Sequence, residues 1–331
     1  MRDLRPDDRR RVLGAIAVTA AMLLAVACGG GEPTTRFHAS RVIAFGDESS
    51  MIVDTAGDAN GRKYSVNATV SDTDLTINCA ANPIWVQSVA TLYGLVFPQC
   101  NPGPTPDPAP VSRIRATFGA RAADLAAQID AQQAESPLQS GDIVTVMVGE
   151  YDVLAQYAQY PTVGEAELIA NLEAAGAETG RQVNRLADTG AKVLVSTIIE
   201  LGFTPFAVHE NAANADIDRA ALLSRLTARY NAGMRATMVN DGRRIGLILL
   251  DEFVSAVGKN VGLGGYTNAT AGVCDLTRST LTPPSILDCT AQTFIPGGTG
   301  AYLWADDLHL SATGQSSFAT LALSRAENNP F

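Results

Sequence analysis

Largely apolar runs separated by longer amphipathic segments organise this chain. Runs that stay apolar, without alternation, are typical of strands covered on both faces of a parallel sheet. The segments between them are rich in Ala, Leu, Arg, Glu and Gln, with apolar positions at helical spacing. The predicted strands are 41–45, 143–148, 192–199 and 245–250, and the predicted helices are 120–133, 165–189, 217–239 and 312–326.

The alternation of strands and helices predicts a three-layer α/β fold, in which helices cover both faces of a parallel sheet through right-handed crossovers. Ligands of such sheets bind at the carboxyl ends of the strands. The candidate segments there are 47–50, 149–152 and 200–205. Segments 61–82 and 101–110 read as irregular insertions. One domain accounts for the pattern.

The N-terminal segment has the pattern of an export signal. Several arginines precede an uncharged apolar stretch, 12–27, which is short for a membrane span but suits a signal peptide. Leu24-Ala25-Val26-Ala27-Cys28-Gly29 is similar to a bacterial lipobox, in which Cys28 becomes the lipidated first residue. We therefore expect a signal peptide over 1–27, a lipidated tether over 28–40 and a single domain over 41–331. The alternative is a secretory peptide cut near Ala27.

This leader places the protein in the cell envelope, held to a membrane by acyl chains without spanning it. Glycine after Cys28 favours the outer membrane by analogy with enterobacterial sorting, on its periplasmic side or at the cell surface. Secretion is the alternative location. The formal net charge of -10 excludes nucleic acid as a partner, because no Lys/Arg excess is present to neutralise phosphates.

Four cysteines besides Cys28 support an oxidising compartment. They fall into two local pairs, Cys79 with Cys100 and Cys274 with Cys289, and we expect disulfides within each pair. Other pairings, or four reduced buried thiols, are the alternatives.

Histidine is scarce, which narrows the choice of a general base. The chain has 3 histidines: His38 lies in the tether, His209 at the start of a polar loop, and His309 ahead of the last helix. Only His309 has a carboxylate, Asp306, three residues before it in an aromatic context. Histidine oriented by a carboxylate is the base of serine hydrolases. A solvated side chain is the alternative for each.

Four further segments precede this pair in a characteristic order. They are Phe45-Gly46-Asp47-Glu48-Ser49, then Asn82-Pro83-Ile84-Trp85-Val86, then Ala116-Thr117-Phe118-Gly119 with Gln128-Ile129-Asp130, then Val148-Gly149-Glu150-Tyr151-Asp152. With Asp306-x-x-His309 they resemble the blocks of the SGNH/GDSL esterases and lipases across nearly the whole mature chain. The resemblance implies that family's flavodoxin-like sheet, with Gly119 N–H as an oxyanion donor, His309 as base and Asp306, more than Asp307, as its orienter.

Two residues depart from the family pattern. Tyr151 stands where the family has an asparagine that binds the oxyanion. The Tyr151 hydroxyl is a donor on a longer, rigid ring, and the alternative is that Tyr151 is a packing aromatic. Glu48 stands where the nucleophilic serine belongs, and beside His309 it would hold the imidazole protonated. Ser49 and, less favourably, Ser50 are the alternative nucleophiles, although a shift of one residue moves the Cα by about 3.8 Å.

The sequence therefore leads to two main hypotheses. The first is an exported, lipid-anchored hydrolase of carboxylic esters, either lipid acyl esters or O-acetylated carbohydrate, that uses Ser49, His309 and Asp306. The second is a catalytically impaired lipoprotein that binds an envelope glycan or lipid through Glu48, Tyr151, Asp152 and His309. In a third, Glu48 acts as a base on water. None requires a metal or organic cofactor, and no zinc-binding set is visible.

Overall fold

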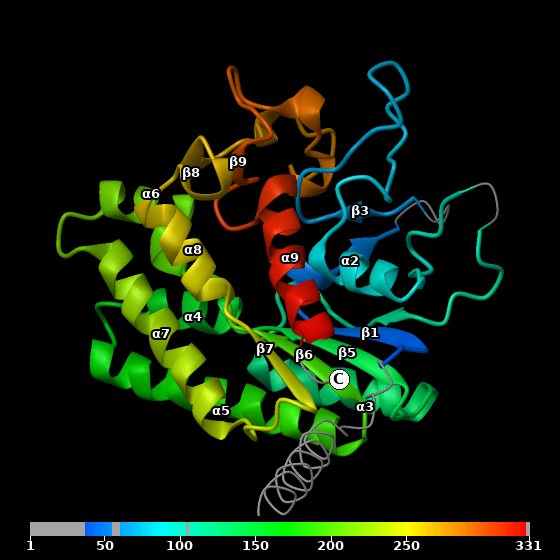
Figure 1. Cartoon of the computed structure of the whole chain (residues 1–331). Coiled ribbons are helices and arrows are strands. Elements are labelled where there is room, and N and C mark those ends of the chain that lie inside the picture. Colours follow the sequence, from blue (N-terminus) through cyan, green and yellow to red (C-terminus); the bar gives the residue numbers. More distant parts are fainter. Residues whose placement is uncertain (1–36, 55–59, 104–105, 329–331) are drawn as a thin grey trace, which may run out of the picture. The chain divides into compact units, whose positions relative to one another are not determined.

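A parallel sheet forms the centre of the structure (Figure 1). The computed structural model describes residues 37–54, 60–103 and 106–328. Within them the central sheet has, in spatial order, the strands β4 (Arg113–Ile114), β1 (Arg41–Gly46), β5 (Asp142–Met147), β6 (Lys192–Ser196) and β7 (Ile245–Ile248). All neighbouring pairs are parallel. Numbered along the chain this order is 2-1-3-4-5, the flavodoxin-like order, so the predicted fold class is confirmed.

The four predicted strands were right in place, but those from 192 and 245 were predicted to run too far at their carboxyl ends. The run from Lys192 leaves the ladder after Ser196, where the Ile198 N–H donates to Asn231 Oδ1 at 3.2 Å. Leu250 begins helix α8 and does not end a strand. The short edge strand β4 was missed, because its two residues form no apolar run.

Helices cover both faces of this sheet. In the described residues they are α2 (Trp85–Leu92), α3 (Leu125–Glu135), α4 (Glu150–Tyr157), α5 (Glu165–Asp188), α6 (Pro205–Ala213), α7 (Arg219–Thr237), α8 (Leu250–Lys259) and α9 (Ala312–Asn328). Helices α3 and α5 pack on one face, and α2 and α9 on the other (Figure 1). Helices α5 and α9 match their predicted ranges closely. His209, expected in a loop, lies in α6, because Thr204 caps that helix and Pro205 opens it.

The two faces have separate cores because strand side chains alternate. Ile43 and Phe45 of β1 join α3 and α5 residues in one buried cluster. On the opposite face the Trp85 ring of α2 stacks on Phe318 of α9, with centroids 4.6 Å apart. These layers hold the carboxyl ends of the strands in fixed positions.

A smaller substructure lies beyond those ends. It contains the antiparallel pair β2 (Ile52–Val53) and β3 (Arg62–Lys63) and the parallel pair β8 (Asn268–Gly272) and β9 (Tyr302–Trp304). The structure joins Cys79 to Cys100 and Cys274 to Cys289, each with a Cα separation of 5.7 Å, which are the expected pairings. Disulfides suit this part of the chain, because little regular structure stabilises it.

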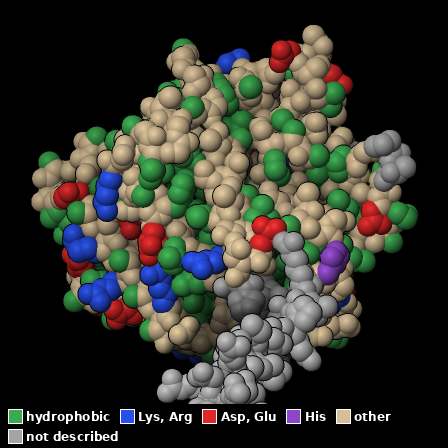
Figure 2. All heavy atoms as spheres, in the orientation of Figure 1, with side chains coloured by type: hydrophobic (Ala, Val, Ile, Leu, Met, Phe, Trp, Pro, Cys, Tyr) green, Lys and Arg blue, Asp and Glu red, His purple; other side chains and the backbone are tan. Residues whose placement is uncertain are grey.

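Ion pairs between basic and acidic side chains lie on one face of the molecule. Figure 2 shows basic and acidic side chains interspersed over α5 and α7. Arg225 pairs there with Glu165 at 2.6 Å, and Arg229 with Glu173 at 3.3 Å. Exposed pairs of this kind contribute little stability. No basic patch for a nucleic acid is visible in this view.

The expected signal peptide, Cys28 and most of the tether lie outside the described residues. Among the residues that are described, no helix is both long and apolar enough to cross a membrane. The compact unit begins at His38.

Candidate functional site

The candidate residues come together at the carboxyl end of the central sheet. Asp47 and Glu48 follow β1, and Tyr151 lies in the first turn of α4, just after β5. Asp306 and His309 lie in the loop between β9 and α9. We call Glu48, Gly119, Tyr151, Asp306 and His309 the His309 site.

The turn after β1 depends on a glycine. Gly46 has φ 120°, and a Cβ there would lie 1.7 Å from the Met147 carbonyl oxygen, so no other residue fits. Gln128 of α3 binds both backbone groups of Gly46: its Oε1 accepts the N–H at 2.8 Å and its Nε2 donates to the carbonyl at 2.9 Å. Asp47 then caps a short 3-10 helix, Glu48–Ser50, by accepting the Ser49 N–H at 3.1 Å. These contacts direct the Glu48 side chain inward.

The Glu48 carboxylate is held by three groups. Its Oε2 accepts the Gly119 N–H at 3.0 Å, and its Oε1 accepts the Tyr151 hydroxyl. His309 Nε2 lies 3.4 Å from the same Oε1. The side chain is only 2% exposed. Both groups proposed from sequence as oxyanion donors therefore bind Glu48 itself.

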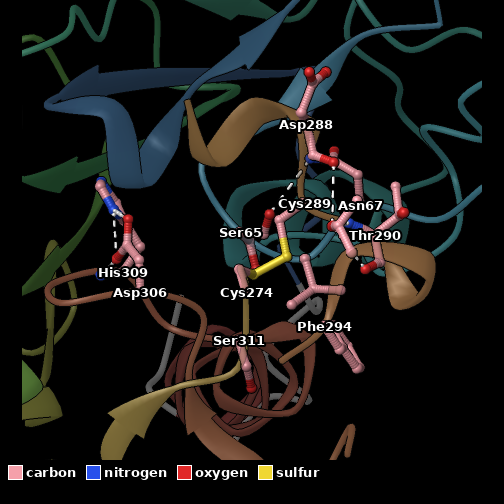
Figure 3. Close-up of a disulfide and its surroundings, with 12 residues drawn as sticks. Ser65, Asn67, Cys274, Asp288, Cys289, Thr290, Phe294, Asp306, His309 and Ser311 are labelled. Atoms are coloured by element: carbon pink, nitrogen blue, oxygen red, sulfur yellow. Dashed lines mark hydrogen bonds and ion pairs between the residues drawn. A yellow bond between two sulfur atoms is a disulfide. The ribbon is translucent and has the colours of Figure 1, made fainter. Parts of the chain in front are cut away.

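Asp306 contacts the other nitrogen of the imidazole. His309 Nδ1 lies 2.9 Å from Asp306 Oδ2 and 3.0 Å from Oδ1 (Figure 3). Asp306 Oδ1 also accepts the backbone N–H groups of Leu308 and His309, at 3.0 and 2.7 Å, which fixes the carboxylate. Asp307 lies instead 3.3 Å from Nδ1 of His209.

The charges of the site make His309 a cation. Burial disfavours the charged imidazole, but Asp306 and Glu48 outweigh this effect and raise the pKa of His309 well above its ordinary value. Burial likewise opposes ionisation of Glu48, yet hydrogen bonds from His309, Tyr151 and Gly119 lower its pKa. The pKa of Asp306 is also lowered, because His309 outweighs its burial. An imidazolium thus lies between two carboxylates, and it cannot accept a proton.

Two neighbouring acids, Asp47 and Glu150, resist ionisation, because their pKa values are raised. Burial, reinforced by the Glu48 charge, raises the pKa of Asp47 to about 8, and Asp47 Oδ2 has no hydrogen-bond partner among the described residues. Burial and then Asp47 raise the pKa of Glu150 well above its ordinary value. Repulsion between close carboxylates would oppose ionisation of all of them together.

The candidate serines do not meet His309. Ser50 is fully buried, and its hydroxyl has no partner in the described part of the chain. Ser49 is partly exposed, and among the described residues no hydrogen bond joins its hydroxyl to His309. The imidazole Nε2 points to Glu48. Acyl transfer through either serine would require the turn to be rebuilt.

Asp152, the other binding candidate, supports the oxyanion segment. Its Oδ2 accepts the Ala122 N–H at 2.8 Å, and burial raises its pKa to about 6. Gly119, three residues before Ala122, has φ 71°. Burial and the hydrogen bond to Glu48 raise the pKa of Tyr151 above its ordinary range, so its hydroxyl remains a donor.

A row of aromatic rings borders the site, and we call Tyr64, Phe118 and Tyr151 the aromatic row. Tyr64 and Phe118 were not foreseen as functional. The centroid of the Tyr64 ring lies 5.7 Å from that of the His309 ring, with an interplanar angle of 32°. It lies 5.4 Å from the centroid of the Phe118 ring, with an interplanar angle of 31°. Phe118 is 60% exposed and also meets the Tyr151 ring at 5.9 Å. Phe118 could have been identified from the sequence, because it precedes the predicted oxyanion residue Gly119. Tyr64 lies in a segment that was read as an irregular insertion, and nothing in the sequence marked it as a site residue.

Metal chemistry has no visible support in this site. Within the described ranges, no group of three or more His, Cys, Asp or Glu side chains is arranged to hold a metal ion. The site offers hydrogen-bond acceptors and one imidazolium.

Comparisons with known proteins give likenesses of structure only. No protein-family model and no curated protein matches the sequence. An acetyl xylan esterase of known structure is 14% identical with a TM-score of 0.40, covering 86% of this chain and 98% of its own. An acetylxylan esterase from Geobacillus stearothermophilus is 15% identical, with a TM-score of 0.39 and coverage of 88% and 96%. An alpha/beta hydrolase enzyme from the metagenome of Lake Arreo, Spain, is 16% identical, with a TM-score of 0.39 and coverage of 89% and 98%.

Proposed function

We propose that this protein is an SGNH/GDSL-like domain that binds a ligand at the His309 site without the acyl transfer of a serine esterase. The observation that carries the proposal is the Glu48 carboxylate, which accepts the Gly119 N–H and the Tyr151 hydroxyl and lies 3.4 Å from His309 Nε2. Ester hydrolysis needs a nucleophile, a neutral base and free oxyanion donors. Glu48 removes all three at once.

Attack by Glu48 itself does not restore the reaction. A carboxylate that attacks an ester forms an anhydride, and the ion pair with His309 lowers the nucleophilicity of the carboxylate further. The third hypothesis, Glu48 as a base on water, also conflicts with its lowered pKa, because a weakly basic carboxylate is a poor proton acceptor at neutral pH. The ligand-binding hypothesis requires none of these steps.

The aromatic row favours an uncharged sugar ring as the ligand, and so a glycan over a lipid. Phe118 offers an exposed ring face, and the apolar face of a sugar can stack on such a ring while its hydroxyls reach polar neighbours. A fatty acyl chain would need a continuous apolar surface. Of the large apolar side chains that are strongly exposed in the described part of the chain, Phe118 alone belongs to the aromatic row. The nearby carboxylates disfavour an anionic ligand.

Hydrolysis of 4-nitrophenyl acetate tests the proposal. We expect the wild-type protein to hydrolyse this ester at the background rate, and Glu48→Ser to raise the rate by about 100-fold, the lower end of what a general base contributes. Glu48→Ala removes the same ion pair without supplying a nucleophile and is the matched control. Combining Glu48→Ser with His309→Ala should abolish the gain.

The opposite result would support the esterase hypothesis. Rapid hydrolysis by the wild-type protein that disappears in both Ser49→Ala and His309→Ala would overturn the proposal. Retention of that activity in Ser49→Ala but not in Ser50→Ala would identify the buried serine as the nucleophile.

The cell envelope is the proposed location. The lipobox-like segment before Cys28 and the two disulfides support export into an oxidising compartment. Metabolic labelling with an alkyne-bearing fatty acid tests lipidation, because label should appear in the wild-type chain and not in Cys28→Ser. A chain that is secreted unlabelled would favour the plain secretory peptide.

A further inference from the structure

We propose that the Cys274–Cys289 disulfide and Ser65 hold the loop of Asp306 and His309 in place against Glu48 and the segment of Tyr64, so that His309 can leave Glu48 while the central sheet stays folded. This inference rests on the proposed function in one respect: it concerns control of the same ligand site. We call the disulfide, Ser65 and Asn67 the disulfide clamp.

The clamp is connected to the His309 loop by backbone hydrogen bonds. The Cys274 N–H donates to the carbonyl of Ala305, the residue before Asp306, at 2.8 Å. The Ala305 N–H in turn donates to the His309 carbonyl at 2.7 Å, which closes the loop on itself. A displacement of Cys274 would therefore reach Asp306 and His309 directly.

The same clamp is connected to the segment of Tyr64, whose ring lies beside His309. The Asn67 N–H donates to the Cys289 carbonyl at 2.8 Å. The Ser65 hydroxyl, fully buried, donates to the Leu310 carbonyl at 2.8 Å. Because Tyr64 precedes Ser65, these two bonds set the ring of Tyr64 against that of His309. Figure 3 shows the disulfide beside Ser65, with His309 and Asp306 to one side.

The sulfur–sulfur bond crosslinks the segment of Ala305 and the segment of Asn67. Cys274 belongs to the segment that holds Ala305, whereas Cys289 belongs to the segment that holds Asn67. The buried cluster around them is small: Val66, Val273, Cys274, Ile286, Cys289 and Ala305. It shares no residue with the large cluster under the sheet. Removing one crosslink takes away a large part of the stability of a small core. The larger core under the sheet does not depend on this crosslink.

Reduction of the Cys274–Cys289 disulfide would open the clamp. A dithiol reductant transfers two electrons and two protons to the disulfide, the sulfur–sulfur bond breaks, and Cys274 and Cys289 become thiols. The reductant is oxidised to its own disulfide. Nothing else in the site changes its oxidation state.

The test compares two pairs of cysteine substitutions in the full chain. Cys274→Ser with Cys289→Ser opens the clamp, and Cys79→Ser with Cys100→Ser removes the other disulfide as the matched control. NMR titration of the His309 ring reports its contact with Glu48, and far-UV circular dichroism reports the sheet and helices. Neither readout needs a ligand or an activity, so the result stands apart from the ester and sugar experiments.

We expect the clamp variant to keep its circular dichroism spectrum while the pKa of His309 falls by about 1 or more, as loss of a nearby carboxylate requires. The control variant should keep the raised value. Ser65→Ala leaves the disulfide intact and should lower the pKa of His309 by a smaller amount. This variant tests the proposal if the clamp variant does not fold. An unchanged His309 titration in the clamp variant, or an equal change in both disulfide variants, would overturn the proposal.

Discussion

Tyr151 donates its hydroxyl to the Glu48 carboxylate, so the two residues that depart from the esterase pattern are bonded to each other. The Tyr151 hydroxyl supplies a donor to the carboxylate that Glu48 buries. An unpaired buried carboxylate would cost several kcal/mol. The hydrogen bond from Tyr151 therefore stabilises the buried Glu48 carboxylate.

Glu48→Gln should lower the pKa of His309. The amide keeps the size of the side chain but removes the negative charge 3.4 Å from Nε2, and loss of an opposite charge at this range lowers a histidine pKa by about 1 to 3. The NMR titration of the ring measures the change. Asp307→Asn is the control, because Asp307 contacts His209. Equal titration of His309 in wild type and Glu48→Gln would mean that the ion pair does not form.

Gln128→Ala should destabilise the protein by about 1 to 3 kcal/mol, the cost of one buried unsatisfied group. The Gly46 N–H loses its acceptor, whereas the Gly46 carbonyl loses the Gln128 amide but keeps the Thr117 N–H at 3.0 Å. Urea unfolding measures the change in the free energy of unfolding. Gln139→Ala, at an exposed position, should be close to neutral. A loss below about 0.5 kcal/mol, the usual size for a surface change, would show that Gln128 does not support the turn.

Lys63 should make stability rise with pH in the alkaline range. Its ammonium is fully buried and donates to the carbonyls of Cys79, Ala81 and Asn82 at 3.0, 2.7 and 2.9 Å. Burial lowers the pKa of Lys63 from 10.5 to about 7. Between these two values the unfolded chain binds more protons than the folded one, so the free energy of unfolding increases with pH. Below about pH 7 both states are protonated, and this contribution is constant.

Urea unfolding between pH 7 and 10 measures that increase. The part due to Lys63 should be absent from Lys63→Met and present in Lys259→Met, a lysine at the end of α8. A steeper rise in wild type than in Lys63→Met supports the prediction. Parallel curves would show that the Lys63 amine stays charged throughout, stabilised by its three carbonyl acceptors.

Phe118→Leu should weaken binding of a neutral oligosaccharide by about 2- to 10-fold, because an aromatic stacking contact contributes about 0.5 to 1.5 kcal/mol. Leucine keeps an apolar side chain but removes the ring face, whereas Phe118→Trp keeps it and should retain binding. Calorimetric titration with cellohexaose measures the affinity. Leu75→Ala, at another exposed apolar position, is the control.

The lipid alternative predicts a different pattern. If dodecylphosphocholine binds and cellohexaose does not, the glycan assignment fails while the non-hydrolytic role of Glu48 is unaffected. If cellohexaose binds equally to wild type and Phe118→Leu, the sugar does not stack on Phe118.

Much of the fold was readable from the sequence because it depends on local patterns. The apolar runs of β1 and β5 and the helical spacing of α5 are properties of neighbouring residues, and alternation then implies a parallel sheet. The same reasoning missed β4 and overextended β6. A two-residue edge strand has no pattern, and the end of a strand is set by partners such as Asn231, which is distant in the chain.

The sequence by itself determined the Asp306–His309 pair, because three residues along one loop suffice to bring a carboxylate to an imidazole. It also identified Glu48 and Tyr151 as unusual. Only the tertiary structure decided that Glu48 contacts Gly119, Tyr151 and His309, and that the Tyr64 ring lies beside the imidazole. Those groups are brought together from five separate segments, and the oxygen that each donor meets depends on side-chain directions and packing that no local pattern contains.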